Sequence, residues 1–451
     1  VVNNGFPLGR GIAYSTRQVE HLLNVVARNM SALADRPSHF VEWLRTRHEY
    51  ADLPESVLRE QFIPRRIFGD YLQSVLFWYA KTADSGTLGG IESLNCEALD
   101  ITLNGPHATI ALVGGQQVKA DKVVLATGNN PPAELPVSAP SGNHAGYIGN
   151  PWQPWNGQPQ NNGENAVLVG TGLTMIDAYL TLKAEGWRGK VIALSRNGLL
   201  PLAHFKGIEY PDFPPEDVAS YSLEKLVALM EAHCAKLRKD GNNPAIVVDK
   251  LRPFTQRIWE HFSVQEKQEV SRRYRAPWGV HRHRIAESIH RQLTDGIANG
   301  QLQIVKGKIT TIRSETARWV IDYEDAASHK RATLTGSLVI NCTGPRESYA
   351  RGHSALFKNL FAKGLVQADE LDMGIRVAGD FTVLDQQGKR SPCLYAMGPL
   401  LKGSLWETTA VPELRLQAFQ VAETILATFE GVRQPTIPPM EAYADVLEYC
   451  I

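Results

Sequence analysis

Paired cysteines are missing from this sequence. Its 451 residues include five cysteines, and none of them forms a C-x-x-C pair. This scatter argues against a disulfide framework, a zinc knuckle and a dithiol redox centre. Isolated thiols are typical of a reducing compartment, so we expect a cytoplasmic location.

An excess of either charge and any long apolar run are missing as well. Lys and Arg total 47, as do Asp and Glu, so we expect no nucleic-acid partner. No segment reaches the roughly 18 to 20 apolar residues that a membrane span needs, so we expect no membrane partner. The favoured partner is a small molecule, and the composition leaves homo-oligomerisation open.

What is present is a chain of 43% hydrophobic residues, long enough for two or three domains. Residues 17–47 and 66–81 have helical patterns, and short alternating strands follow at 98–126. The stretch 129–164 is rich in Pro, Gly and Asn, which is typical of a connection between domains.

A β-α-β pattern comes next, followed by helices, further strands and a closing helix. The β-α-β unit consists of a strand at 165–169, a helix at about 174–185 and a strand at 190–195. The later predicted segments are helices at 221–239, 252–298 and 406–429 and strands at 302–312, 317–323 and 338–340.

The sharpest local signal is Gly170-Thr171-Gly172, between the first strand and the helix of this unit. Glycines there let the backbone approach a pyrophosphate, while the helix start, with Thr174, offers unpaired N–H groups. The third glycine of the usual fingerprint is replaced by Met175. The pattern predicts nucleotide binding, and the alternative is an ordinary strand-to-helix turn.

The next strand ends at Ser195-Arg196, about where an NAD-binding unit places a carboxylate for the ribose. A hydroxyl and a guanidinium suit a 2′-phosphate instead, and one charge-assisted contact is worth roughly 1.5 to 3 kcal/mol, or about 10- to 100-fold in affinity. The pair therefore predicts NADP, and the alternative is a surface arginine after a strand.

Two further strands end in Thr-Gly, at Thr127-Gly128 and at Thr343-Gly344. Each turn brings backbone close to a cofactor or redirects the chain between domains, and either alone is commonplace. Because one turn precedes the Gly170 unit and the other follows it, their placement indicates that one domain is inserted into another.

Short motifs extend through nearly the whole chain: Gly9–Ser15, His21–Val25, Pro64–Arg66, Asp70–Leu72, Ala126–Gly128, Gly170–Gly172, Leu394–Pro399 and Leu405–Glu413. Together they resemble the FAD/NAD(P)-binding family of two-dinucleotide-binding flavoproteins. The resemblance implies an α/β fold with two Rossmann-like domains and additional helical segments, binding FAD and NADP. It implies an FAD domain split into 1–150 and 336–451, around an NADP domain at 151–335 with a helical insertion at about 215–298.

The family's opening strand and Gly-rich loop have no counterpart here and would lie upstream of Val1. The acidic ribose ligand expected at the end of the second strand is matched by Asn3 or Asn4. Because the other FAD-domain motifs are present, we expect that the native gene encodes the missing segment and that this start is truncated or processed.

A finer resemblance rests on Leu23-Asn24, Pro37-x-x-Phe40-x-x-Trp43-Leu44 and Pro64-Arg65-x-x-Phe68-x-Asp70-Tyr71-Leu72. These stretches are similar to flavin-dependent N-hydroxylating monooxygenases, which implies that NADPH reduces FAD and that an oxygen atom is then added to an amine. An amino acid or a similar small molecule is the implied substrate. The alternatives are a reductase or dehydrogenase without oxygen insertion, and a non-catalytic nucleotide-binding or sensing protein.

No catalytic residue is assigned from the sequence, and no metal site is predicted. Arg282 and Arg284 are candidates either for binding a carboxylate or phosphate or for structural salt bridges, and a metal at His281 and His283 is disfavoured because no carboxylate or cysteine is near in sequence. The predicted cofactor contacts are Gly9, Arg10, Asn24, Arg65, Thr127, Gly128, Gly170, Thr171, Gly172, Thr174, Ser195, Arg196, Thr343, Gly344, Gly398 and Thr408. Arg66, Glu407 and Thr409 are alternatives beside Arg65 and Thr408.

Overall fold

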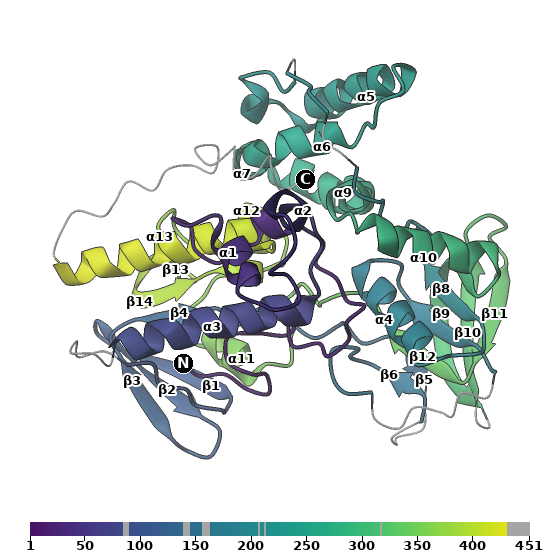
Figure 1. Cartoon of the computed structure of the whole chain (residues 1–451). Coiled ribbons are helices and arrows are strands. Elements are labelled where there is room, and N and C mark those ends of the chain that lie inside the picture. The colour runs from purple at the N-terminus through teal and green to yellow at the C-terminus, as the bar shows by residue number, and fades with distance from the viewer. Residues whose placement is uncertain are drawn as a thin grey trace.

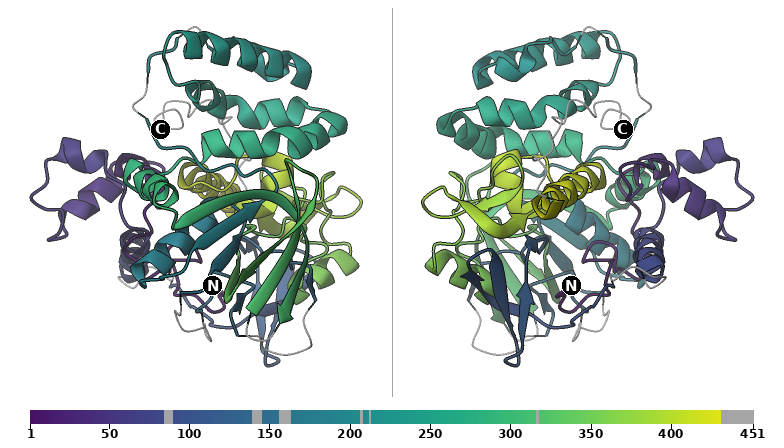
Figure 2. Two further views of the ribbon diagram at one scale, coloured as in Figure 1. Left: turned by 90° about the vertical axis from the view of Figure 1, so that its right-hand side faces the viewer. Right: turned by 90° about the vertical axis from the view of Figure 1, so that its left-hand side faces the viewer.

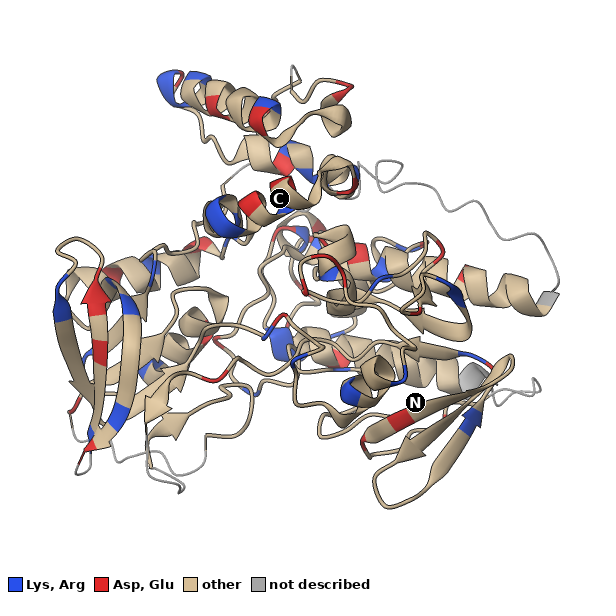
Figure 3. Ribbon diagram, turned by 180° about the vertical axis from the view of Figure 1, so that it is seen from behind, with Lys and Arg blue, Asp and Glu red and all other residues tan. Residues whose placement is uncertain are grey.

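The computed structural model describes residues 1–83, 90–138, 145–155, 163–205, 208–211, 213–315 and 318–430 (Figure 1). Parts of the predicted connection at 129–164 and of the predicted final segment at 336–451 lie outside the described residues. Among those that are described, no helix is long and apolar enough to cross a membrane. Figure 3 shows positive and negative residues interspersed over the sheets and helices.

The larger sheet has eight strands in the order β11-β10-β9-β8-β7-β12-β6, with β5 paired to β9. Strands β6, β12, β7, β8 and β9 are parallel, and β10 and β11 turn back antiparallel. Their bounds are β5 Val137–Ser138, β6 Tyr147–Ile148, β7 Ala166–Val169, β8 Val191–Ser195, β9 Leu302–Glu315, β10 Arg318–Asp325, β11 Arg331–Gly336 and β12 Leu338–Asn341.

The centre of this sheet confirms the predicted β-α-β unit. Strands β7 and β12 are buried at every residue, as continuous apolar runs in a parallel sheet are. Helices α4 (Leu173–Ala184) and α10 (Glu287–Ala298) pack in one core with β7 and β8, through Ile176 and Leu293 among others. The strand β11 was not predicted from the sequence.

Strands outside the predicted range 151–335 also belong to the larger sheet. The short strands β5 and β6 precede residue 151, and β12 follows residue 335, yet all three are hydrogen-bonded in this sheet. The sheet is therefore assembled from a longer stretch than the predicted boundaries suggest.

A smaller mixed sheet joins segments that are far apart in sequence, with β13 antiparallel to β14. Its order is β13-β14-β4, and β14 lies parallel to β4 with Leu394 opposite Val123. One core contains Leu125, Ile101 and Ile110 from the first part of the chain together with Leu360 and Leu394 from the last. The chain thus leaves this unit and returns to it. The elements involved are β1 Ala98–Asn104, β2 His107–Leu112, β3 Gln117–Ala120, β4 Val123–Leu125, α11 Ala355–Ala362, β13 Thr382–Leu384 and β14 Arg390–Ala396.

The helix predicted at 17–47 is wrong for most of its length. Only η1 (Ala27–Asn29) and α1 (His39–Arg45) are helical there, and they are followed by α2 (Glu55–Arg59) and α3 (Arg65–Ala83). Leu23 N–H donates to the carbonyl of Ile63, and Ala27 N–H to that of Gln61, so the backbone at 22–27 is paired along a distant segment. This pairing replaces the helix that the local pattern favours.

The helical insertion lies above both sheets in Figure 1, and Figure 2 shows the same arrangement from two other sides. The predicted helix at 252–298 is divided into short helices. Phe262 is extended, and Ser263 forms a capping box with Glu266 that begins a new helix. The elements are η2 Val218–Ser220, α5 Leu223–Lys239, α6 Ile246–Leu251, η3 Arg252–Phe254, α7 Thr255–His261, α8 Val264–Glu269, η4 Val270–Tyr274 and α9 Arg275–Arg282.

The closing helix begins five residues later than predicted. Residues 406–410 form a loop in which Trp406 has a φ of 61°, and α13 extends over Val411–Glu430. Before this loop lie η5 (Gly398–Leu401) and α12 (Lys402–Leu405). The loop therefore lies between the end of β14 and the last helix.

Candidate functional site

The Gly-x-Gly turn lies at the carboxyl end of β7 and leads into α4. Gly170 has a φ of 118°, and a Cβ there would lie 2.4 Å from the carbonyl oxygen of Cys342, so only glycine fits. Gly172 is the N-cap of α4, supplies no side chain to the first-turn N–H groups, and has nothing within 4 Å of an added Cβ. An open, uncapped helix start suits a pyrophosphate.

The side chains around this turn are tied to one another. The hydroxyls of Thr171 and Ser195 lie 2.9 Å apart, and the N–H of Gly198 donates to Ser195 Oγ at 3.0 Å. Thr174 is half-buried in the first turn of α4, and Arg196 is exposed. The structure thus brings both halves of the predicted NADP site together at the ends of β7 and β8.

Thr343 and Gly344 follow β12, the neighbour of β7 on its other side. Thr343 Oγ1 donates to Asn341 Oδ1 at 2.7 Å, and Gly344 has a φ of 82°. Because Gly170 touches the backbone of Cys342, the Thr343 turn lies beside the Gly-x-Gly turn. The carboxyl ends of adjacent parallel strands are where α/β sheets bind ligands.

A second group of predicted cofactor contacts lies at the ends of β4 and β14. Met397 N–H donates to Leu125 O at 3.1 Å, so the Thr127-Gly128 turn and Gly398 follow neighbouring strands. Gly398 N–H donates to Gln417 Oε1 at 2.9 Å.

Thr408 belongs to the same network as Gly398. Its hydroxyl donates to the Gly398 carbonyl at 3.0 Å and accepts from Gln417 Nε2 at 2.7 Å, and the residue is completely buried. These polar atoms hold the closing loop against the end of β14. Gln417, on α13, was not singled out from the sequence, because nothing local marks a glutamine in a long helix as a partner for a distant loop.

Two antiparallel crossovers connect the two regions. Pro132 and Pro345 form an isolated β-bridge, and Arg346 N–H donates to the carbonyl of Pro131. The hydroxyl of Tyr349 donates to Gly128 O at 2.8 Å. Each of the two Thr-Gly turns therefore begins a connection between the sheets, and the two connections lie side by side.

Gly9 and Arg10 lie against α3. Arg10 forms an ion pair with Asp70, and its Nε donates to Gln73 Oε1 at 2.9 Å. Gly9 has a φ of 84°, and an added Cβ there would contact Gln73 at 3.6 Å. Their contacts within the described residues hold the first segment onto this helix.

Arg65 and Asn24 lie at the contact between the first segment and α4. Arg65 Nη1 donates to Asp177 Oδ2 at 2.6 Å, and its Nε donates to Leu22 O at 2.9 Å. The carbonyl of Asn24 accepts from His204 Nε2 at 2.7 Å. These bonds direct Arg65 towards α4 rather than towards the turns after β4 and β14.

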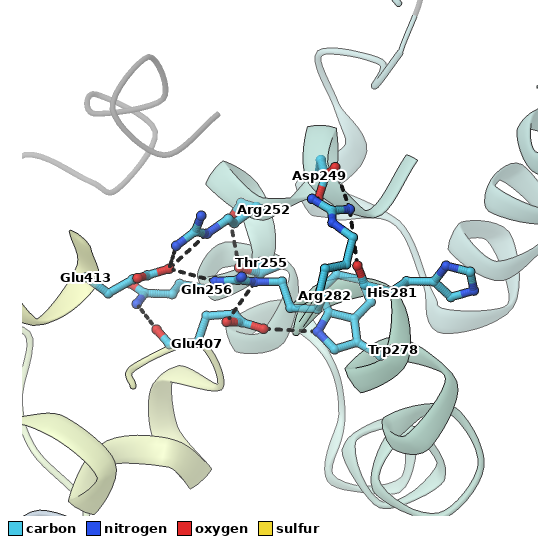
Figure 4. Close-up of polar contacts among 10 residues, drawn as sticks. Asp249, Arg252, Thr255, Gln256, Trp278, His281, Arg282, Glu407 and Glu413 are labelled. Carbon is cyan, nitrogen blue, oxygen red and sulfur yellow. Dashed lines mark hydrogen bonds and ion pairs between the residues drawn. The ribbon is translucent and has the colours of Figure 1, made fainter. Parts of the chain in front are cut away.

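A buried network of ion pairs joins the helical insertion to the closing segment (Figure 4). Arg252 pairs with Glu413 at 2.6 Å, and Arg282 lies 3.3 Å from Glu407 and 3.4 Å from Glu413. Trp278 Nε1 donates to Glu407 Oε1 at 3.0 Å. Burial raises the pKa of Glu407, but the positive charges of Arg282 and its neighbours outweigh it and lower the pKa to about 2.

The salt-bridge alternative for Arg282 and Arg284 is thereby confirmed. Arg284 lies 2.9 Å from Asp249, and both side chains are buried. Burial, followed by the charge of Arg282, lowers the pKa of His283 to about 4. Within the described part of the chain, no group of three or more His, Cys, Asp or Glu residues is placed to hold a metal ion.

A shallow cavity of about 380 Å³ lies where the insertion, the second crossover and residues 370–373 meet. Its lining carries both charges and an apolar wall, formed by Gln268, Ser271, Arg272, Glu347, Glu370, Leu371 and Met373. Glu347 pairs with Lys402 at 2.7 Å and also with Arg275. The sequence did not predict this cavity, because its residues come from distant segments.

The folded chain is similar to solved structures of flavin-dependent N-hydroxylating enzymes. The reduced ornithine hydroxylase from Pseudomonas aeruginosa has a TM-score of 0.57 and 13% sequence identity, over 93% of this chain and 89% of that one. The ornithine N-hydroxylase from Kutzneria sp. 744, with reduced FAD, NADP+ and L-ornithine, has a TM-score of 0.59 and 13% identity, over 95% and 99%. The FAD-bound cadaverine monooxygenase from Erwinia amylovora has a TM-score of 0.55 and 13% identity, over 96% and 89%.

The chain has the two-dinucleotide-binding flavoprotein fold. The predicted fold class is confirmed, with the sheet of β7 and β8 between the two parts of the other unit. Residues 1–130 match a family model described as FAD-NAD(P)-binding. No curated protein matches the sequence.

Proposed function

We propose that this protein is an NADPH-dependent FAD oxidoreductase, and specifically a monooxygenase that hydroxylates the amine of an amino acid or a similar small molecule. One observation carries the proposal: each of the two sheets has glycine turns at the carboxyl ends of its parallel strands, and two connections that lie side by side join these two edges. This arrangement would hold two dinucleotides at a fixed separation. The fold similarity and the FAD-NAD(P)-binding description of residues 1–130 support it.

The residues at both edges fit such cofactors. An added Cβ at Gly128, Gly172 or Gly344 would have nothing within 4 Å, so space is open in front of each turn. Gly170–Gly172 and Ser195-Arg196 would hold NADP, and Thr127-Gly128 with the Gly398 segment would lie along FAD. When bound, FAD would supply hydride transfer and oxygen activation.

The chain itself would bind and orient the cofactors and the substrate, and it would exclude water from the site. Thr408 and Gln417 keep the closing loop against Gly398, and the ion pairs of Arg252 and Arg282 keep the insertion over that loop. Closing a site in this way strengthens every polar contact inside it.

The charged cavity beside Glu347 suits a small substrate with an amine. Glu347 and Arg272 on its lining are already paired within the chain, Glu347 with Lys402 and Arg275, and Arg272 with Glu269. Glu370 takes part in no ion pair among the described residues, so its carboxylate is the group on this lining that an amine would meet. The three similar structures named above are of enzymes named for ornithine or cadaverine. A diamine-like amino acid is thus the substrate class that we infer.

The proposed organisation follows the strands of the two sheets. The NADP unit would include β5 through β12 with the insertion, and the FAD unit would include the segments before and after it. We also infer a cytoplasmic location and a small-molecule partner, as the composition predicts.

The first experiment follows the visible absorption of the purified protein, expressed from its full-length gene, during anaerobic addition of NADPH and then NADH. Bleaching of a flavin band that is faster with NADPH supports the proposal. Oxygen is then admitted with L-ornithine, L-lysine or cadaverine, and hydroxylated amine is measured. Reduction of the flavin without hydroxylated amine would instead indicate a reductase. A colourless protein that takes up no FAD would indicate a non-catalytic nucleotide-binding protein.

A further inference from the structure

Lys306 lies beside the predicted NADP turn but comes from a different strand. In the parallel pairing of β8 with β9, Ser195 is opposite Lys306. Lys306 is exposed, whereas its neighbours Val305 and Gly307 are buried. The lysine therefore projects from the sheet at the carboxyl end of β8.

The turn after β8 packs on the stem of this lysine. A Cβ added at Gly198 would lie 3.2 Å from Lys306 Cβ and 3.6 Å from its Cγ. The N–H of Gly198 also donates to Ser195 Oγ. Lys306 thus starts directly beneath the turn that carries Ser195 and Arg196.

No ion pair within the described residues involves Lys306 or Arg196. The next lysine along the strand, Lys308, is opposite Glu324 in the antiparallel pairing with β10. Asp325 accepts hydrogen bonds from the N–H and hydroxyl of Ser328, within its own turn. Ser195 thus has two exposed cationic residues next to it, Arg196 along the chain and Lys306 across the strand pair, and neither is in an ion pair with a described carboxylate.

We propose that Lys306 is a second specificity-determining residue for the 2′-phosphate of NADP(H), acting with Arg196; this inference rests on the proposed function. A phosphate monoester carries close to two negative charges at neutral pH, so two cations match it better than one. The guanidinium offers a planar pair of donors, and the ammonium on its flexible stem adds a point charge from the neighbouring strand. The contacts with Thr171 and Gly198 would hold the Ser195 hydroxyl in one orientation. From there it would donate a hydrogen bond to the 2′-phosphate between the two cations.

The experiment measures binding of NADP+ and NAD+ to the whole protein by calorimetry. Lys306→Met keeps the apolar stem beneath Gly198 and removes the charge, and Lys306→Arg restores it. Lys190→Met is the matched control, because Lys190 is exposed and immediately precedes β8, at the opposite end of the sheet. We expect Lys306→Met to weaken NADP+ binding about tenfold or more and to leave NAD+ binding within about twofold.

The two related probes 2′,5′-ADP and 5′-AMP locate the effect on the phosphate. The dissociation constant of 2′,5′-ADP should rise in Lys306→Met and recover in Lys306→Arg, with 5′-AMP unaffected. Equal losses for NADP+ and NAD+, or none for either, would overturn the role of Lys306. If the unaltered protein binds neither dinucleotide, the proposed function itself fails.

Discussion

The guanidinium of Arg65 and the carboxylate of Asp177 form a buried ion pair at 2.6 Å between the first segment of the chain and α4. Each side chain is only 10% exposed. His21 Nε2 strengthens the same contact by donating to the backbone carbonyl of Asp177 at 3.0 Å. This pair fixes α4 against the part of the chain that carries the FAD-like motifs.

Arg65→Met should lower the thermal stability markedly, because it leaves the carboxylate of Asp177 buried without its partner. Removing one member of a buried pair costs about 3 to 5 kcal/mol. Arg66→Met is the matched control, since Arg66 is exposed beside it. A melting temperature of Arg65→Met equal to that of the control would show that the pair contributes little.

Arg282→Gln should disturb the closing loop without unfolding the sheets. Arg282 contacts Glu407, and the adjacent Trp406 stacks on Trp259 at 4.4 Å with an interplanar angle of 25°. Stacked indoles give a strong near-ultraviolet circular dichroism signal, which should fall in this variant. Arg272→Gln, an exposed change on the same insertion, should leave the signal unchanged. If the spectrum of Arg282→Gln matches that of the unaltered protein, the ion pair does not maintain the tryptophan stacking.

Stability should fall as the pH drops from about 6.5 to about 4. Burial lowers the pKa of His204 from 6.5 to about 4, with the charge of Arg284 adding to it. Between these values the unfolded chain binds a proton that the folded chain refuses, so acid favours unfolding.

The lowered pKa of Glu407 acts in a different range. Its stabilisation is complete above 4.5 and is lost as the pH falls towards about 2. Melting temperatures between pH 4 and pH 7 therefore report mainly on the histidines. His204→Gln should flatten that profile, and an unchanged slope would assign the effect to other groups.

Gly170→Ala should abolish nucleotide binding and destabilise the protein. The new methyl group would lie 2.4 Å from Cys342 O, at a φ of 118° that alanine disfavours, and such backbone strain costs on the order of 1 to 3 kcal/mol. Gly172→Ala has open space and should fold normally. Calorimetry with NADP+ and thermal melting separate the two variants, and equal melting temperatures for both would contradict the role of the close contact.

The local sequence was enough to predict the elements that are marked by a continuous apolar run or by a glycine turn. The apolar runs of β7 and β8, the glycines between β7 and α4, and the paired Thr-Gly turns predicted a nucleotide unit inserted into a second unit. These features need only neighbouring residues, because the turn at Gly170 is dictated by its backbone conformation and buried parallel strands are apolar throughout. The motif resemblance added the flavoprotein fold.

The tertiary structure decided what depends on partners far away in the chain. The backbone at 22–27 pairs with 61–64 instead of forming a helix, and Arg65 faces Asp177 rather than the turns after β4 and β14. The basic run ending at Arg284 forms ion pairs with Asp249 and with the closing segment, and Lys306 meets Ser195 only through the register of two strands. The identity of a residue determines the chemistry of its side chain. The partner of that side chain is determined by packing between distant segments, and no short sequence pattern contains this information.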